Sequence, residues 1–118
     1  MEDERASYRI LIDALVGACE GQGQVGARKV VAGIWDRNAD DHALDMPDQR
    51  AMNEVLRRLS ADDRKVLAKM MADEFMGGVH ETLEVLYEHQ VHPFDHGYEG
   101  APFDDFVGRL AGWEWPEE

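Results

Sequence analysis

The sequence has little of what several classes of protein require. It contains one cysteine, Cys19, so no disulfide can form within the chain, which is compatible with a reducing compartment. No apolar run approaches the roughly 18 residues that a membrane-spanning helix needs. Residues 1–5 are net acidic, where a signal peptide would be basic. We therefore expect a cytoplasmic protein that does not act at a membrane.

Positive charge is also scarce, above all in the second half. The 118 residues contain 25 acids and 12 Lys and Arg, which gives a net charge of −13. Residues 61–118 hold 14 of these acids and 4 of the bases, and Arg109 is the only base after Lys69. Such a chain repels phosphate groups, so we expect no nucleic-acid partner and no anionic membrane surface. A basic protein or a second copy of the chain, forming a homodimer, would fit.

Alternating polar and apolar residues, which are typical of strands, are absent, whereas helical spacing is frequent. This spacing predicts helices over residues 8–19, 27–35 and 47–59. In the first of them Tyr8, Leu11, Leu15 and Ala18 share a face. Asp45 before Pro47 is typical of a helix start.

A long fourth helix is predicted to follow. Ser60 and Asp63 have capping-box spacing, which marks its start, and Pro93 stops it near residues 89–91. A short fifth helix is expected from Pro102 to Gly112. The prediction is an all-α fold, a compact single domain over residues 1–118. It is a bundle of about five helices, with the long fourth helix at its centre.

Two glycine groupings interrupt this pattern. Residues 21–26 match G-x-G-x-x-G, which holds a dinucleotide where it joins a strand to a helix. The preceding residues have a helical period, so we interpret this segment as a connection between helices. Gly77 and Gly78 fall inside the fourth helix, where each glycine costs about 0.5–1 kcal/mol relative to alanine. We expect a close helix approach, a kink or a break there, with a small-molecule pocket under the bend as one consequence.

Histidines and carboxylates are concentrated between residues 80 and 99. On a continuous helix His80, Glu84 and Glu88 stack at intervals of four, and His89 and His92 follow. Imidazoles and carboxylates are ligands of divalent transition metals, so one hypothesis is a metal-binding protein or a metal-dependent hydrolase centred on residues 80–96. The H-E-x-x-H motif and paired E-x-x-H motifs are lacking. A solvated helix face is the other interpretation. We predict no catalytic residue and no cofactor apart from this divalent metal.

Aromatic side chains crowd the last quarter of the chain. They either fold the tail back over the helices or form a recognition surface within an acidic rim. Such a surface would suit a cationic partner through cation–π contacts. Our leading hypothesis is a non-enzymatic, acidic binding protein that uses its C-terminal half, with the candidate anchors Phe94, Tyr98, Trp113 and Trp115. The metal-dependent function is the alternative.

Several short segments of the last third carry a resemblance. They are Gly77-Gly78-Val79-His80, Pro93-Phe94-Asp95, Tyr98-Glu99-Gly100, Pro102-Phe103 and Gly112-Trp113-Glu114-Trp115-Pro116. Together they resemble a small family of short, acidic bacterial proteins of unknown function. The resemblance implies a compact helical protein and brings with it no activity, ligand or catalytic residue.

Overall fold

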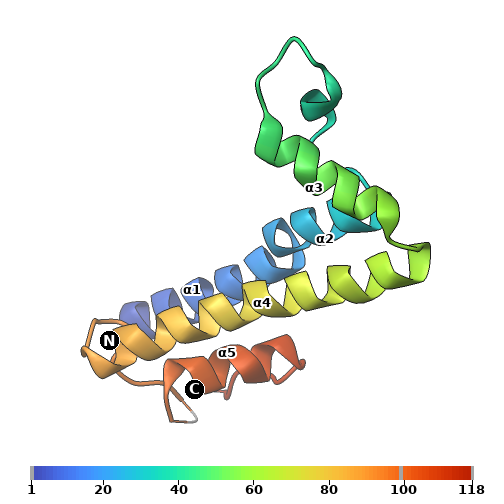
Figure 1. Ribbon diagram of the computed structural model, residues 1–118. Coiled ribbons are helices and arrows are strands. Elements are labelled where there is room, and N and C mark those ends of the chain that lie inside the picture. The colour runs from blue at the N-terminus through green and yellow to red at the C-terminus, as the bar shows by residue number, and fades with distance from the viewer. Residues whose placement is uncertain (1, 99, 118) are drawn as a thin grey trace. The chain divides into compact units, whose positions relative to one another are not determined.

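A computed structural model of the chain describes residues 2–98 and 100–117, and over these it is all-α. Helices account for 72% of the chain, and the described residues contain no strand. The α-helices are α1 (Glu2–Glu20), α2 (Val25–Ala32), α3 (Pro47–Arg58), α4 (Ala61–Glu88) and α5 (Pro102–Leu110) (Figure 1). Two 3-10 turns accompany them, η1 (Gln22–Gln24) and η2 (Arg37–Asp40). The all-α prediction is therefore confirmed.

The helix count differs slightly from the prediction. Only Gly21 separates α1 from η1, and α2 follows η1 directly, so these three elements form one helical stretch. Counted in this way, the described chain has four stretches that contain an α-helix, instead of the predicted five. Helices on both sides of residues 21–24 confirm that the glycine motif connects helices.

The helices form two compact units. The terminal unit comprises Met1–Gly21 and Phe75–Glu118, and the middle unit comprises Gln22–Glu74. The long helix α4 belongs to both, because its first half lies in the middle unit and its second half in the terminal unit. That the chain is a single domain stays a prediction.

The core of the terminal unit is built from α1, the second half of α4 and α5 (Figure 1). Its buried residues are Tyr8, Ile12, Cys19, Leu83 and Phe106. The spacing of Tyr8, Ile12 and Cys19 places them on one face of α1. Leu11 was expected on that face, but its side chain is 41% exposed because it lies one residue to the side of the buried line.

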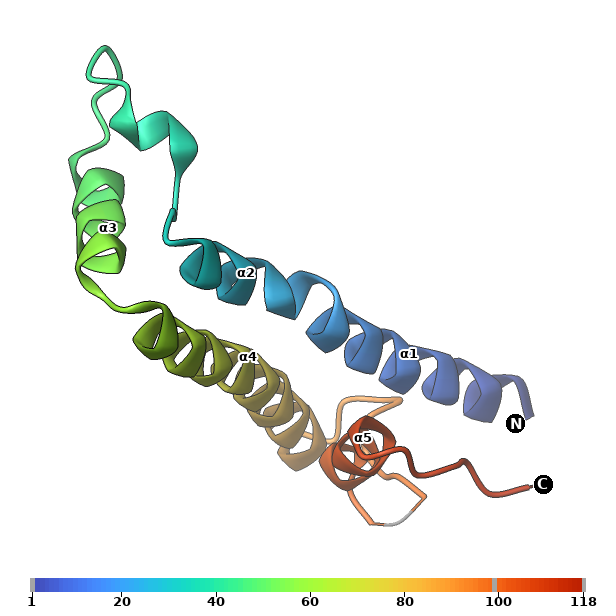
Figure 2. The ribbon, with the colours of Figure 1, turned by 90° about the vertical axis from the view of Figure 1, so that its right-hand side faces the viewer.

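The core of the middle unit lies among α2, α3 and the first half of α4 (Figure 2). Its buried residues are Ala27, Val30, Leu56, Ala68 and Ala72. Three of the five are alanines, whose small side chains fill little of the space between helices. This core is therefore thin, and it leaves room for the groove described below.

Local signals set some of the helix starts. The hydroxyl of Ser60 accepts a hydrogen bond from the backbone N–H of Asp63 at 3.0 Å, which confirms the predicted start of α4. Helix α3 begins at Pro47 as expected. Its N-cap is Met46, however, and no side chain caps it, so Asp45 does not have the capping role that its position suggested.

Helix α4 runs through Gly77 and Gly78 without a break. Both glycines are exposed, and a Cβ atom added at either would meet no atom within 4 Å. The expected close approach or break is therefore not found, because helix formation over 28 residues outweighs the unfavourable propensity of two glycines. Over the described residues, no helix combines the length and the apolar character that crossing a membrane requires.

Candidate binding groove

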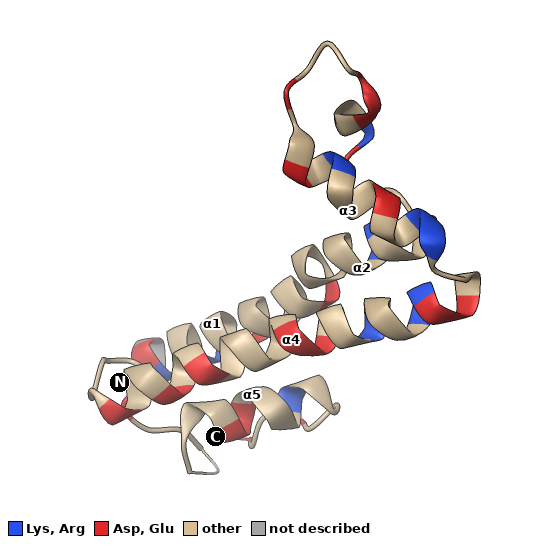
Figure 3. Ribbon diagram, in the orientation of Figure 1, with Lys and Arg blue, Asp and Glu red and all other residues tan. Residues whose placement is uncertain are grey.

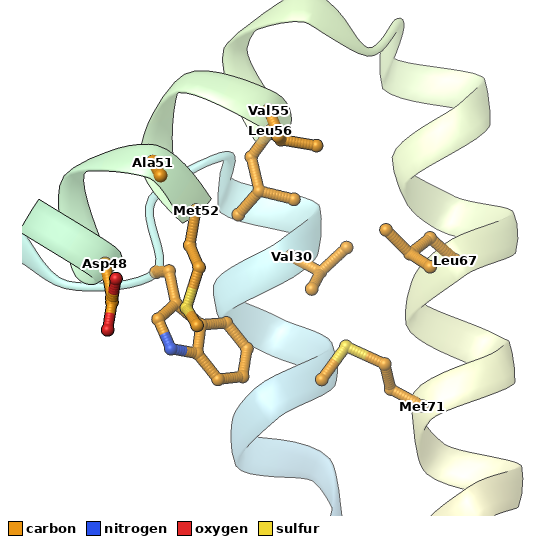
Figure 4. A pocket seen from close by; sticks show the side chains of 9 residues that line it. Val30, Asp48, Ala51, Met52, Val55, Leu56, Leu67 and Met71 are labelled. Carbon is orange, nitrogen blue, oxygen red and sulfur yellow. The ribbon is translucent and has the colours of Figure 1, made fainter.

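An apolar groove opens among α2, α3 and the first half of α4, wholly within the middle unit. Its volume is about 530 Å³. We call it the Trp35 groove, and it is lined by Val30, Trp35, Asp48, Ala51, Met52, Val55, Leu56, Leu67 and Met71. Figure 4 shows Val30, Met52 and Met71 pointing toward one another from three different helices. Eight of the nine lining side chains are apolar, so the groove offers desolvation rather than hydrogen bonds.

The position of Trp35 is fixed by a buried asparagine on α3. Asn53 is fully buried, and its carbonyl oxygen accepts hydrogen bonds from the backbone N–H groups of Trp35 at 2.7 Å and Asp36 at 3.0 Å. Its amide nitrogen donates to the backbone carbonyl of Asp36 at 2.7 Å and to the Asp40 carboxylate at 3.3 Å. One side chain therefore holds the segment after α2 against α3.

Two arginines add further ties around the groove. The Arg57 guanidinium donates to the Asp40 carboxylate at 2.6 Å, and this hydrogen bond holds the pKa of Asp40 below its usual range. Arg64 on α4 donates to the backbone carbonyls of Leu59 at 3.0 Å and Val31 at 3.3 Å. Because these carbonyls lie at the ends of α3 and α2, Arg64 joins all three helices that form the groove.

Gly26, the last glycine of the G-x-G-x-x-G segment, lies beside the groove. A Cβ atom at this position would be 3.0 Å from the methyl group of Met71 and 3.5 Å from the Trp35 ring. The glycine thus leaves room for two lining side chains to approach α2. Close packing therefore explains why a glycine stands at this position, without a role in phosphate binding.

Apolar surface continues outside the groove. Met52 and Val55, which line it, are 44% and 48% exposed, and the neighbouring Val31, Val66 and Met70 are exposed as well. Methionine is unbranched and polarizable, and it is frequent on surfaces that adapt to a partner. The middle unit therefore has exposed apolar side chains both in the groove and outside it.

The four predicted aromatic anchors gather around Tyr8 in the terminal unit. Ring centroids of Phe94 and Tyr98 lie 6.2 and 5.9 Å from that of Tyr8, and Trp115 lies 5.2 Å from both Tyr98 and Trp113. All four side chains are half-buried. The structure thus brings these residues together, against the core rather than away from it.

Cations of the chain itself occupy the faces of these rings. The Arg5 and Arg9 guanidinium carbons lie 4.1 and 4.9 Å from the Tyr98 ring centroid, and that of Arg109 lies 5.4 Å from the Trp115 ring. These three are the only bases that the sequence places in the terminal unit. A recognition surface for a cationic partner at these aromatics stays a prediction, and these contacts give it no support.

Hydrogen bonds hold the tail in place beside the aromatic cluster. Asp13 accepts from the Arg109 guanidinium at 2.7 Å and from the Trp115 indole at 3.1 Å. Arg9 donates to the backbone carbonyl of Pro116 at 2.7 Å. Arg9 and Asp13, which lie on the same face of α1, therefore both hold the tail.

The predicted metal ligands are spread along the end of α4 and the following turn. His80 is half-buried against Phe103, with ring centroids 5.0 Å apart, and Glu84 is half-buried, whereas Glu88 and His89 are exposed. The exposed His92 lies 3.3 Å from Asp95 and 3.9 Å from Glu4. In residues 2–98 and 100–117, no group of three or more His, Cys, Asp or Glu side chains could hold a metal ion. The metal site stays a prediction.

Sequence reasoning missed the Trp35 groove, because it assigned the lining residues to ordinary core stripes. The available signal was the width of those stripes. Apolar residues stand side by side at Val30–Val31, Val55–Leu56 and Met70–Met71, which makes the apolar stripe of each helix wider than a single line of residues. Such wide stripes on three helices predict apolar surface that extends beyond the core.

Comparison with known proteins gives one result. The model of a family of unknown function, DUF6547, matches residues 1–117. The resemblance seen in the last third of the sequence therefore extends over almost the whole chain. No curated protein and no solved structure matches the chain significantly.

Proposed function

We propose that this chain, which belongs to the DUF6547 family of unknown function, is a binding protein that receives apolar side chains of a partner in the Trp35 groove. The groove itself carries the proposal, because eight of the nine side chains around its roughly 530 Å³ are apolar. Ligand sites in proteins are typically concave and mostly apolar, with volumes of roughly 300–1,000 Å³. The groove matches that description in shape, size and lining.

The chemistry of the lining favours binding over catalysis. Asp48 is the one ionisable group among the nine lining residues. Enzymes commonly pair a nucleophile or a general acid–base group with a second group that activates it, and the groove side chains provide no such pair. They provide apolar surface instead, and covering this surface with a partner is favourable because it removes apolar atoms from water.

The exposed methionine and valine set the scale of that gain. Complete burial of a Val or Met side chain contributes about 1.5–3 kcal/mol. Met52 and Val55 are each nearly half exposed, so covering both would contribute about 1.5–3 kcal/mol in total. A partner that also covers Trp35 and the deeper Leu67 would gain more.

The proposal keeps the predicted non-enzymatic binding role and moves it from the C-terminal half to the middle unit. The aromatic side chains of the acidic C-terminal half already have cationic neighbours in Arg5, Arg9 and Arg109. In the groove, Trp35 has a cationic neighbour in Lys29, 5.1 Å from its ring centroid, but the apolar side chains of Met52 and Val55 are 44% and 48% exposed. A partner therefore gains more by covering the groove.

Binding of the neutral, apolar dye Nile red tests the proposal. We expect its fluorescence to rise with the unmodified protein and to respond much less to Val55→Glu, because a carboxylate then lies in the groove. Val85→Glu is the matched control, since Val85 is a similarly exposed valine (45%) on α4 that does not line the groove. Equal dye binding by the two variants would refute the proposed function.

A further inference from the structure

The Trp35 groove has the form of a helix-binding site. Its lining residues on α3 extend from Asp48 to Leu56, and those on α4 extend from Leu67 to Met71. At 1.5 Å per residue the α3 side is about 12 Å long, which corresponds to about two turns of a docked helix. Amphipathic helices bind in such grooves through apolar residues at positions i, i+3 or i+4, and i+7.

Carboxylates flank this apolar lining. Asp48 lines the groove at the start of α3. On α4, Asp63 comes four residues before Leu67, and Glu74 comes three residues after Met71. Residues three and four apart lie on the same helix face, so both exposed carboxylates lie on the groove side of α4.

Seven of the nine bases in the middle unit (Figure 3) are turned away or already have partners, among them Arg50, which donates to the Leu44 carbonyl, and Arg58, which lies 4.0 Å from Glu54. Lys65 and Lys69 stand two residues from Leu67, which is about 200° around the helix and so on the opposite side of α4. Arg57 donates to Asp40, and Arg64 donates to backbone carbonyls. The ammonium group of Lys29 lies over the Trp35 ring, 5.1 Å from its centroid.

From this arrangement we infer that the occupant of the Trp35 groove is a basic amphipathic α-helix of a partner protein. The inference rests on the proposed function. The apolar face of this partner helix covers Val55, Leu67 and the two methionines that line the groove. Lys or Arg residues at the edge of that face meet Asp48, Asp63 and Glu74.

The same charges argue against other occupants. A second copy of the chain carries the same net charge of −13, so the two copies repel each other as they approach. A fatty acid would place its carboxylate among these carboxylates. A basic helix instead gains electrostatic attraction as it approaches, which accelerates association and selects the partner.

Two synthetic 18-residue helices with identical leucine positions test the inference, one with Lys and one with Glu on the polar face. We expect the Lys helix to bind at least tenfold more tightly at low salt, and to lose most of this advantage at 0.5 M NaCl. Isotope-labelled methionine methyl groups report the site by NMR. The signals of Met52 and Met71 should shift, whereas that of Met76, in the core of the terminal unit, should not.

Charge variants separate the groove from general attraction to an acidic protein. The triple variant Asp48→Asn, Asp63→Asn, Glu74→Gln should weaken binding of the Lys helix about tenfold. The triple variant Asp45→Asn, Asp62→Asn, Asp73→Asn removes the same charge from exposed positions that neither line the groove nor lie three or four residues from a lining residue of α4, and should change the affinity less than twofold.

Each outcome bears on a different statement. Binding of the Glu helix as tight as that of the Lys helix, or an equal effect of the two triple variants, would overturn the inference. So would a dimer of the chain in analytical ultracentrifugation that Val55→Glu dissociates, because the occupant would then be a second copy. Nile red binding that depends on Val55, without binding of either helix, would leave the proposed function standing and remove the inference alone.

Discussion

Replacing Asn53 by alanine should loosen the middle unit more than any other single hydrogen-bonding change there. The side chain is fully buried and makes four hydrogen bonds, three of them between 2.7 and 3.0 Å. Each such bond contributes about 0.5–1.5 kcal/mol, so the three, together with the small cavity left behind, correspond to about 2–4 kcal/mol. The backbone N–H groups of Trp35 and Asp36 would lose their acceptor at the same time.

Two measurements check this expectation. Urea unfolding followed by circular dichroism gives the free energy of unfolding, and amide hydrogen exchange reports on Trp35 and Asp36 directly. Asn38→Ala is the control, because Asn38 is an exposed asparagine in η2, and its effect should stay within about 0.5 kcal/mol. A loss below about 1 kcal/mol for Asn53→Ala, with the Trp35 amide still protected, would refute the view that this side chain holds the segment in place.

Asn53→Asp provides a second, independent test of the same contact. The carboxylate keeps an acceptor for the Trp35 and Asp36 N–H groups. It loses the donor to the Asp36 carbonyl and faces the Asp40 carboxylate instead. We therefore expect this variant to be destabilised at neutral pH as well, and an unchanged stability would contradict the assigned donor.

Three further predictions concern single side chains. The Tyr8 hydroxyl donates to the buried Asp105 at 2.6 Å, and burial raises the pKa of Tyr8 above the usual value of about 10. The contribution of the neutral Tyr8 side chain to stability is therefore complete below about pH 10 and declines as the pH rises further. Melting temperatures between pH 8 and 11 should therefore fall more steeply in the unmodified protein than in Tyr8→Phe; parallel curves would contradict this. Gly77→Ala should raise the free energy of unfolding in urea by about 0.5–1 kcal/mol, since a Cβ there meets nothing within 4 Å, and a loss would reveal a packing role. Arg57→Gln should raise the pKa of Asp40 toward its usual range in a carboxyl NMR titration, and an unchanged titration midpoint would show that Arg57 is not the cause.

Local features of the structure were predictable because their causes lie within a few residues. The hydroxyl of Ser60 caps α4 by accepting a hydrogen bond from the N–H of Asp63, three residues downstream. Pro102 is the first residue of α5, where its missing N–H costs no helical hydrogen bond. The predicted end of α4 before Pro93 agrees with its last residue, Glu88. Met46 rather than Asp45 occupies the N-cap position of α3, which shows that even a local signal fixes such a boundary only to within a residue or two.

Contacts between distant residues were not predictable in the same way. Tyr8 meets Asp105 across 97 positions, and Asp13 meets Trp115 across 102. The sequence showed that aromatics are abundant near the end of the chain, but it contained no signal that Arg5 and Arg9, on the first helix, would lie over Tyr98. A hydrogen bond or a cation–π contact depends on positions in space, which spacing along the chain does not encode.

The amino-acid sequence by itself determined that the chain is helical, where most helices begin and end, and that negative charge dominates the second half. It also showed which side chains of each helix are apolar. Only the tertiary structure decided which of those side chains are covered, because coverage depends on how closely another helix approaches. Val55 and Leu56 are neighbours of similar character, yet one is 48% exposed and the other 5%, and that difference creates the groove.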